Sequence, residues 1–476
     1  MLRSWLEIQP APARGMTIRE PVSHATNVLR NKLWYRGDAS ELDQLFKLLG
    51  DDAVARARFW AAAPESETIR KAHSGLPGIM VDTLVGVVRA DLTDLDFTDQ
   101  DAASRWAALA EENDLPALVA QAVADVLVTG DGAFKISIDP EISNRPILEF
   151  WGADHVEYKQ RHGRICEIDF LMPVGDRGRV LRERYAPGSV SYVLLDGDRA
   201  LPLDDSPELA GLRDVTFDDS LLLAVPVQFW PSARWRGRGQ SIFDKKTDAF
   251  DAHDEIISQW LDAIRAGRVQ KYIPESLIPR DPNTGMLRMP NSFGTNFVQV
   301  GASAKENAQE TINTVQPKIE YEAFVASYSA TLDMCLQGVM SPATLGVDVG
   351  KMASAEAQRE KKDITGMTRN AITAALEKAL PRLAQAALAA EDLLAGRAAG
   401  SYRATVSFGE YGAPDFDSRV QTVGQAATTG VMSVEAQVDE LWGDSKDDAW
   451  KRGEAARIRR ERGIETVPEP AVRLEV

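Results

Sequence analysis

The chain has few of the side chains that most often hold metals or form crosslinks. Its 476 residues include two cysteines and five histidines. Cys166 and Cys335 lie in segments of different character, which excludes a disulfide framework and a cysteine-based zinc site and predicts two buried thiols. The histidines show no HxxxH or HxH spacing; they are His24, His73, His155, His162 and His253. We therefore expect no metal site and no cofactor.

Long apolar runs are also missing. No window approaches the roughly 20 consecutive apolar residues that span a bilayer. The first seven residues, MLRSWLE, lack the charged region and continuous apolar run that a signal peptide requires. We expect a protein that is cytosolic when made and has no membrane partner.

Positive charge is scarce. Lysine and arginine number 54 against 71 aspartates and glutamates, giving a net charge of -17. Such a balance argues against a protein that grips nucleic acid through its phosphates. The one basic cluster, residues 451–462, reads KRGEAARIRRER, and its interleaved glutamates favour a solvated helix face over a nucleic-acid patch.

Catalytic motifs are missing as well, with one loop as a possible exception. There is no G-x-S-x-G elbow, and no pair of acids stands out. The segment WRGRGQS, residues 235–241, precedes a predicted helix N-terminus, where backbone N–H groups could cradle an anion. It lacks the Lys-Ser/Thr pair of a phosphate-binding loop and the third glycine of a dinucleotide fingerprint. We interpret it as a connection; a nucleotide- or phosphate-binding enzyme that uses Arg236 to Ser241 is the alternative.

The chain exceeds one ordinary core, which stops growing near about 250 to 300 residues, so two to four structural units are expected. Apolar periodicity predicts helices over 40–49, 78–88 and 115–128. Short runs rich in Val, Ile, Tyr and Phe, separated by Gly, Asp and Pro, predict strands between Phe134 and Phe229. Helices dominate thereafter, and the fold class is α+β, mainly helical.

Two helices with a seven-residue apolar repeat follow. The first runs over 241–267, with Ser241 and Asp244 as an approximate capping box; its repeat consists of Phe243, Phe250, Ile257 and Ile264. The second runs over 317–339; its repeat includes Tyr321, Val325, Tyr328 and Leu332. Each helix thus presents one apolar seam. The pattern does not distinguish a partner helix in the same chain from one in a neighbouring chain.

The segments around these helices are shorter or polar. Four prolines in 268–316 exclude a continuous helix there, and Tyr272-Ile273 and residues 296–300 predict short strands. A loop over 340–353 precedes a long helix that Ser354 can cap and that reaches about Leu394. A strand over 402–408 and two or three short helices over 415–463 complete the chain.

The order of these elements resembles the portal proteins of tailed double-stranded DNA bacteriophages. Residues 226–230 (PVQFW) leading to 241–243 (SIF) look like the family's entry to its first stem helix. Residues 341–346 (SPATLG) leading to 353–357 (ASAEA) look like its tunnel loop and following helix. The tail 429–435 (TGVMSVE), with Glu454, Arg457 and Glu461, is similar to the crown. Residues 234–239 stand where the family's subgroup often has an Asn pair.

The resemblance implies a portal-like subunit with wing, stem, clip and crown that assembles into a closed ring. The implied regions are an N-terminal α+β wing (1–240), a first stem helix (241–267), a clip (268–316), a second stem helix (317–339), a tunnel loop (340–353), a long wing helix and strand (354–414) and a C-terminal helical crown (415–476).

The resemblance also implies a function without catalysis. Portal rings, usually of twelve subunits, form the channel at one capsid vertex for genome packaging, retention and ejection, and double-stranded DNA passes through them without sequence specificity. Implied partners are the large terminase, the head-tail adaptor, and the major capsid and scaffolding proteins, in the virion and, during assembly, in the host cytoplasm. The residues implied to face the DNA are Met340, Ser341, Thr344 and Lys351. A cellular coiled-coil scaffold is a further alternative.

Overall fold

The computed structural model divides into two compact units, residues 1–409 (unit 1) and 410–476 (unit 2). The residues that the structure describes are 22–48, 59–61, 70–175, 178–209, 211–267, 270–274, 282–285, 296–300, 313–315, 318–346, 355–409, 416–443 and 446–463.

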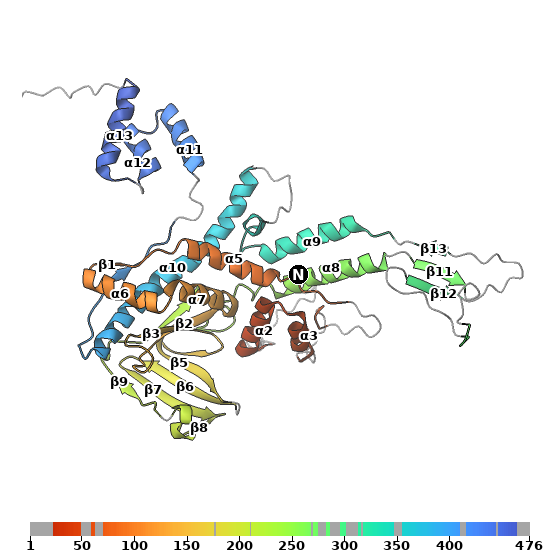
Figure 1. Cartoon of the computed structure of the whole chain (residues 1–476), viewed down its shortest axis with the longest axis horizontal. Coiled ribbons are helices and arrows are strands. Elements are labelled where there is room, and N and C mark those ends of the chain that lie inside the picture. Colours follow the sequence, from red (N-terminus) through yellow and green to blue (C-terminus); the bar gives the residue numbers. More distant parts are fainter. Residues whose placement is uncertain are drawn as a thin grey trace, which may run out of the picture. The chain divides into compact units, whose positions relative to one another are not determined.

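Unit 1 begins with helices that pack around Trp34, Leu84 and Leu127, all of which are buried (Figure 1). These helices are α2 (His24–Arg36), α3 (Ala39–Leu48), α5 (Leu76–Ala90), α6 (Gln100–Glu112) and α7 (Leu115–Thr129). The periodicity predicted α3, α5 and α7 to within two residues at each end. It missed α2, whose buried face carries Asn27, Arg30 and Asn31 and therefore shows no apolar stripe.

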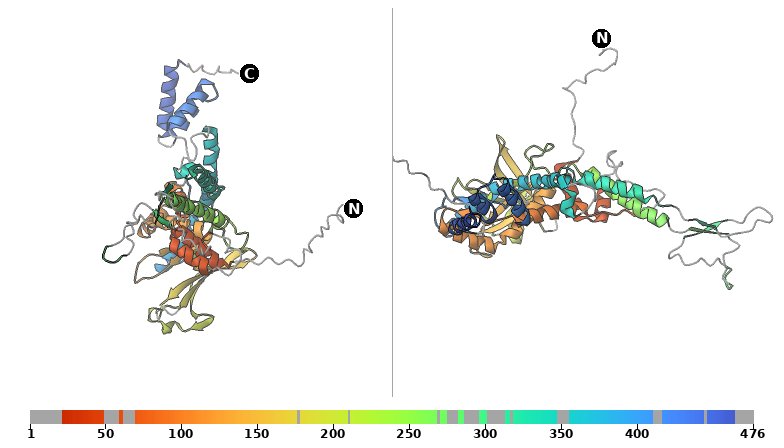
Figure 2. Two further views of the ribbon diagram at one scale, coloured as in Figure 1. Left: turned by 90° about the vertical axis from the view of Figure 1, so that its right-hand side faces the viewer. Right: turned by 90° about the horizontal axis from the view of Figure 1, so that it is seen from above.

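The predicted strand region forms two antiparallel sheets. One is three-stranded in the order β10-β2-β3, from β2 (Asp131–Ser137), β3 (Ile147–Gly152) and β10 (Ala224–Gln228). The other has the order β4-β5-β6-β7-β8, with β9 also paired to β7; its strands are β4 (Val156–Arg161), β5 (Arg164–Val174), β6 (Arg179–Ala186), β7 (Ser189–Asp196), β8 (Arg199–Leu201) and β9 (Val215–Thr216). This larger sheet lies on one side of the helices of unit 1 (Figures 1 and 2). The α+β prediction is confirmed.

Beyond β10 the chain forms a helical hairpin and then a long helix. The elements are α8 (Thr247–Ala266), β11 (Gln270–Pro274), β12 (Asn296–Val300), β13 (Asn313–Val315), α9 (Tyr321–Leu336), the 3-10 helix η4 (Pro342–Leu345), and α10 (Ala355–Leu394). Strand β11 pairs with β12 in parallel and with β13 antiparallel. The two strands predicted in this region are present, and β13 is an addition. The long helix has the predicted bounds.

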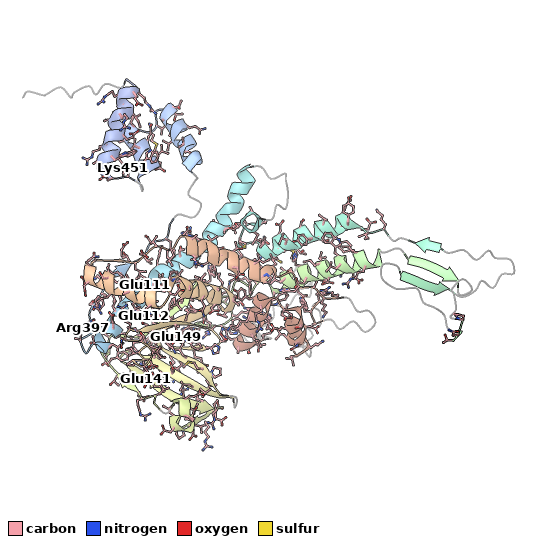
Figure 3. The ribbon with its side chains drawn as sticks, in the orientation of Figure 1. Glu111, Glu112, Glu141, Glu149, Arg397 and Lys451 are labelled. Atoms are coloured by element: carbon pink, nitrogen blue, oxygen red, sulfur yellow. The ribbon has the colours of Figure 1, made fainter. Side chains whose placement is uncertain are left out.

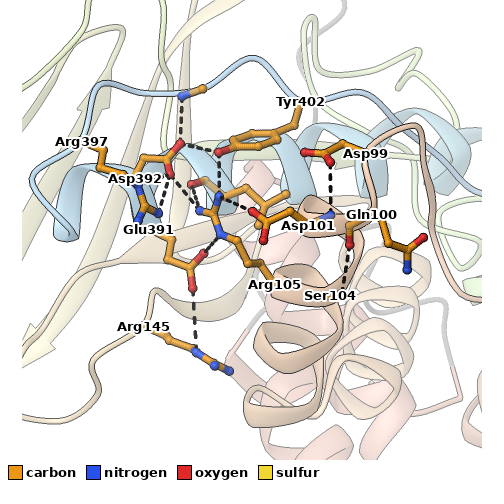
Figure 4. A network of polar contacts seen from close by, with 12 residues as sticks. Asp99, Gln100, Asp101, Ser104, Arg105, Arg145, Glu391, Asp392, Arg397 and Tyr402 are labelled. Carbon is orange, nitrogen blue, oxygen red and sulfur yellow. Dashed lines mark hydrogen bonds and ion pairs between the residues drawn. The ribbon is translucent and has the colours of Figure 1, made fainter.

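A polar network fastens the C-terminal end of α10 to α6 (Figure 4). From α6, Arg105 donates through Nε to Glu391 (2.7 Å) and through Nη2 to Asp392 (2.9 Å). The hydroxyl of Tyr402 donates to Asp392 (2.5 Å). Burial disfavours the charged carboxylate, but the hydrogen bonds from Tyr402 and Arg397 outweigh it and lower the pKa of Asp392 to about 2. The turn after α10 is thereby fixed.

The strand predicted over 402–408 is reduced to β14 (Ala404–Thr405), which pairs with β1 (Asp96–Phe97). The described residues of unit 2 form three short helices, where two or three were predicted: α11 (Phe416–Thr428), α12 (Val434–Trp442) and α13 (Asp448–Glu461). Val434, Val438 and Ala455 form its small core. Among the described residues, no helix combines the length and apolar character that a bilayer crossing requires.

Candidate functional site

The helices α8 and α9 form an antiparallel hairpin, in which they run side by side (Figures 1 and 2). Near its root, where the hairpin joins the rest of unit 1, Nδ1 of His253 lies 2.9 Å from Oγ1 of Thr331. Further out, the rings of Trp260 and Phe324 are stacked, with centroids 6.1 Å apart and planes within 1°. The partner of each helix is therefore a helix of the same chain, which the sequence left open.

The predicted apolar seams change character along the hairpin. Phe243 and Phe250 at the root are fully buried, as is Leu332 on α9. Ile257 and Tyr328 are half-buried. At the far end, Ile264 is 49% exposed, Tyr321 61% and Val325 46%. One chain thus buries the root of the seam and leaves its far end in solvent. Two ring contacts cross the hairpin. The first joins His253 to the heptad residue Tyr328, with centroids 4.9 Å apart. The second joins Trp260 to Phe324, which lie outside the heptad positions.

The buried face of α8 carries several polar residues beside Phe250, which the apolar repeat did not indicate. Asp251 accepts hydrogen bonds from the backbone N–H groups of Phe59 (2.8 Å) and Trp60 (3.2 Å). One helical turn later, Oδ2 of Asp254 accepts from Nε1 of Trp60 (3.2 Å) and from Nδ1 of His73 (2.6 Å). These contacts tie α8 to segments that lie far before it in the sequence.

Two further residues extend this polar stripe in both directions. Asp244 accepts from Nδ2 of Asn27 (2.8 Å) and Asn31 (3.0 Å), both on α2. Oγ of Ser258 accepts from the backbone N–H of Ala72 (2.9 Å). The positions 244, 251 and 258 recur every seven residues, one residue after the apolar repeat. The sequence therefore contains a seven-residue repeat that marks this buried face. Its members are polar, so a search for apolar repeats does not find it.

The helix that was predicted from Ser241 begins at Thr247. Residues 241–246 form turns because Ser241 is buried against the end of α7, where its Oγ donates to the carbonyl oxygen of Leu127 (3.0 Å). Half of the predicted capping box is present, since Asp244 accepts from the backbone N–H of Ser241 (3.0 Å). It closes a turn before the helix instead of capping the helix itself.

Burial shifts the pKa values of three groups at the root. Desolvation lowers the pKa of His253, with Asp254 opposing this shift. Burial raises the pKa of the Cys335 thiol to about 12. It also lowers the pKa of Lys246, whose Nζ donates to the carbonyl oxygen of Met334 (2.8 Å). Cys335 is a buried thiol as expected, whereas Cys166 on β5 is partly exposed, contrary to that expectation.

The loop after α9 is partly inside the protein. Met340 and Ser341 are each 1% exposed, so neither side chain can project from the chain. The backbone N–H of Ser341 donates to Oγ1 of Thr365 on α10 (2.9 Å), which holds the loop against that helix. Thr344 is half-buried, with its Oγ1 2.9 Å from Oγ1 of the same Thr365. Lys351 lies outside the described residues.

A cavity of about 410 Å³ adjoins this loop and the root of α8, lined in part by Trp230, Lys245 and Met367. In the described residues, no cluster of three or more His, Cys, Asp or Glu side chains could hold a metal ion.

The loop 236–241 already holds an anion from its own chain. Nη2 of Arg238 lies 3.0 Å from Oδ1 of Asp131, and the backbone N–H of Gly239 donates to the other oxygen (2.6 Å). Arg238 also donates to the carbonyl oxygens of Ala153 and Val156. Because α8 begins only at Thr247, no helix N-terminus faces the loop. The anion cradle considered as an alternative is thus occupied by Asp131.

The basic cluster of 451–462 lies in unit 2, on and directly after α13, and several of its side chains form ion pairs. Nζ of Lys451, labelled in Figure 3, lies 2.9 Å from Oδ1 of Asp439. Arg457 pairs with Glu454 (2.9 Å), and Arg459 pairs with Glu435 of α12. This arrangement agrees with the interpretation as a solvated helix face.

Known proteins resemble this chain distantly. No protein-family model and no curated protein matches the sequence. Among solved structures, a chain from the neck of an empty gene transfer agent (GTA) particle computed with C6 symmetry is 14% identical, with a TM-score of 0.42, over 78% of this chain and 92% of that one. A chain from the neck of the native GTA particle computed with C12 symmetry is 12% identical, with a TM-score of 0.39, over 81% and 91%. A chain from the virion of the native GTA particle is also 12% identical, with a TM-score of 0.39, over 93% and 95%. Similarity at this level assigns no family to the chain.

Proposed function

We propose that this chain is a portal subunit, and that copies of it close into a ring of twelve through which double-stranded DNA enters and leaves a capsid. One observation carries the proposal. The far half of the α8–α9 hairpin leaves large apolar side chains in solvent on both helices; these are Leu261, Ile264, Tyr321 and Val325. Exposed apolar patches of this kind mark protein interfaces.

A second copy of the same hairpin is the natural cover for these side chains. Each copy offers an identical surface, so a head-to-tail contact repeats from copy to copy and closes when the rotation between neighbours divides a full turn. Because α8 and α9 run side by side in one hairpin, their exposed apolar side chains can take part in one contact. A ring is the expected product.

The proposed channel repels DNA more than it binds it. With a net charge of -17 on each subunit, the ring keeps phosphates from settling at one point. Met340 and Ser341 are buried and are not proposed as DNA contacts. The proposed contacts are Thr344, in η4, and Lys351, which follows η4 in the sequence. We propose no catalysis in this chain.

The remaining partners follow from this role. Residues 268–316 are the proposed docking region for the large terminase and then for the head-tail adaptor, and the energy for DNA movement comes from the terminase. The major capsid and scaffolding proteins are proposed to surround the ring, first in the host cytoplasm and finally in the virion.

The second candidate is a cellular scaffold that uses the hairpin as a coiled-coil module. It is favoured by the same exposed stripe, but it predicts dimers or tetramers instead of closed rings. The phosphate-binding enzyme is not retained, because Asp131 already neutralises the loop that it requires.

Negative-stain electron microscopy of the full-length protein, together with a measurement of the molar mass of the assembly in solution, tests the proposal. We expect rings with a central hole wide enough for duplex DNA. The double variant Ile264→Asp/Val325→Asp should abolish rings while the melting temperature of the subunit is retained. Leu48→Asp, which changes an exposed apolar residue on α3, is the control and should form rings. Dimers or tetramers from the unaltered protein would instead favour the scaffold.

A further inference from the structure

A second cavity lies in unit 1, away from the hairpin. It measures about 640 Å³ and opens between the end of β2, the strands β7 and β9, and the C-terminal end of α10. Ile136, Tyr185 and Leu223, all buried, contribute to its walls. Two leucines at the end of α10, Leu393 and Leu394, also line it. Much of the cavity wall is therefore apolar, and strands and the end of one helix form it.

Its rim is apolar as well, although it faces solvent. Ile142, in the turn between β2 and β3, is 75% exposed, Val215 on β9 is 51% exposed and Ile138 is 40% exposed. These three side chains come from two segments that are distant in sequence and meet at one opening. A ligand confined to the cavity would leave these three side chains exposed to solvent. A partner that covers the opening would bury them, and clusters of exposed apolar side chains mark such contacts.

The charge around the opening has one sign. Three carboxylates line the cavity, those of Asp139, Glu149 and Glu183, and no lysine or arginine is among the described lining residues. Lys135, a buried residue outside the lining, pairs with two of them; its Nζ lies 2.9 Å from Glu149 and 3.3 Å from Glu183. Three carboxylates against one ammonium leave an excess of negative charge. Glu141, in the adjoining turn and labelled with Glu149 in Figure 3, adds to it.

We propose that this opening, which we call the β2–β9 cleft, is a docking site for a partner protein. The partner inserts aliphatic side chains into the cavity and places a lysine or arginine over Asp139 and Glu149. A buried aliphatic anchor supplies most of the affinity, while the complementary charge sets orientation and specificity. The proposal does not depend on the ring, because the cleft lies within one copy of the chain.

Fluorescence anisotropy of the full-length protein tests the cleft with a defined probe. The probe is a fluorescein-labelled peptide of nine residues with leucines and isoleucines around a central pair of lysines. Its partner probe carries glutamates in place of the lysines. At an ionic strength of about 0.15 M, where long-range attraction is screened, we expect the lysine peptide to bind and the glutamate peptide to bind at least about tenfold more weakly.

Variants separate the cleft from general attraction to an acidic protein. Ile142→Asp and Val215→Asp should each weaken binding of the lysine peptide about tenfold. Val431→Asp, in unit 2, adds the same charge at a residue that is 83% exposed and should change nothing. Likewise Glu149→Gln should weaken binding, whereas Glu111→Gln, on the surface of α6, should not. Circular dichroism and thermal melting confirm that each variant is folded.

Three results would overturn the proposal. The first is equal binding of the two peptides. The second is an equal effect of Ile142→Asp and Val431→Asp. The third is a change in the number of subunits on Ile142→Asp, which would make a second copy of this chain the occupant of the cleft. The first two results do not bear on whether the hairpin forms a ring.

Discussion

The carboxylate of Asp254 accepts a 2.6 Å hydrogen bond from Nδ1 of His73, and both side chains are shut off from solvent. The same carboxylate accepts from the backbone N–H of Ser74 (2.9 Å) and from Nε1 of Trp60 (3.2 Å). One acid on α8 therefore serves three donors from segments that lie far earlier in the chain. If a buried acceptor of this kind is removed, its donors stay desolvated in the folded protein without a compensating hydrogen bond, which lowers the free energy of unfolding.

Removing this acid should destabilise unit 1 strongly. Asp254→Ala leaves three buried donors without an acceptor, and we expect a loss of about 3 to 5 kcal/mol in the free energy of unfolding. Urea denaturation followed by tryptophan fluorescence measures it. Glu255→Ala, one residue along on α8, removes a carboxylate that bonds Gln259 at the surface, and should cost less than about 0.5 kcal/mol. Equal losses in the two variants would contradict the assigned role of Asp254.

The close approach of Gly239 to Gly130 should tolerate no side chain. A Cβ at position 239 would overlap the backbone carbonyl of Gly130, whose own φ of +103° excludes an easy adjustment. We expect Gly239→Ala to lower stability by more than about 3 kcal/mol. Gly86→Ala, on α5, meets no atom within 4 Å and should raise stability by about 0.5 to 1 kcal/mol. Thermal melting of both variants measures these two effects. A Gly239→Ala variant as stable as the unaltered protein would contradict the predicted steric overlap.

The ion pair of Arg238 and Asp131 should stabilise the folded chain and should not bind phosphate ligands. Arg238→Ala leaves the Asp131 carboxylate buried without its cation, and the expected loss is about 3 to 5 kcal/mol. Arg236→Ala, at an exposed position in the same loop, should change stability by less than about 0.5 kcal/mol. Phosphate and ATP should leave the melting temperature of the unaltered protein unchanged, since a ligand that binds the folded state would raise it. A clear rise would revive the phosphate site.

Acid should weaken the protein through His24, which packs edge-on against Trp235 with ring centroids 5.2 Å apart. Burial, assisted by Arg238, lowers the pKa of His24 to about 4 from an ordinary 6.5. Between these values the unfolded chain takes a proton that the folded chain refuses, so stability falls as the pH drops from 6.5 to 4.

The matched measurement compares His24→Gln with the unaltered protein at pH 7 and pH 4.5. After allowance for solvent around a partly buried group, we expect the unaltered protein to lose about 2 kcal/mol more than the variant. His162→Gln, in an exposed turn, is the control and should follow the unaltered protein. The same loss in all three proteins would remove His24 as the cause.

The sequence predicted the elements whose apolar side chains repeat, and it missed contacts made by polar ones. Helix α10 and two strands within residues 268–316 were predicted from residue type and from the positions of prolines. The start of α8 was misplaced because Ser241 is a good N-cap by type, while its real partner, Leu127, is distant in sequence. Asp244 was predicted only as part of a capping box, and no pattern predicted roles for the buried acids Asp251 and Asp254. Nothing in a local pattern shows which donors will meet a carboxylate.

The polar stripe on α8 also fixes how the helix is turned about its own axis. An apolar face can roll by several degrees over its neighbours and lose little, because dispersion contacts are many and weakly directional. Hydrogen bonds at positions 244, 251, 254 and 258 tolerate far less misalignment. They therefore set the direction in which side chains farther along α8 point, including that of the exposed Ile264. In an assembly of identical copies, a small error in that direction would be repeated at each contact, and these buried acids hold it constant.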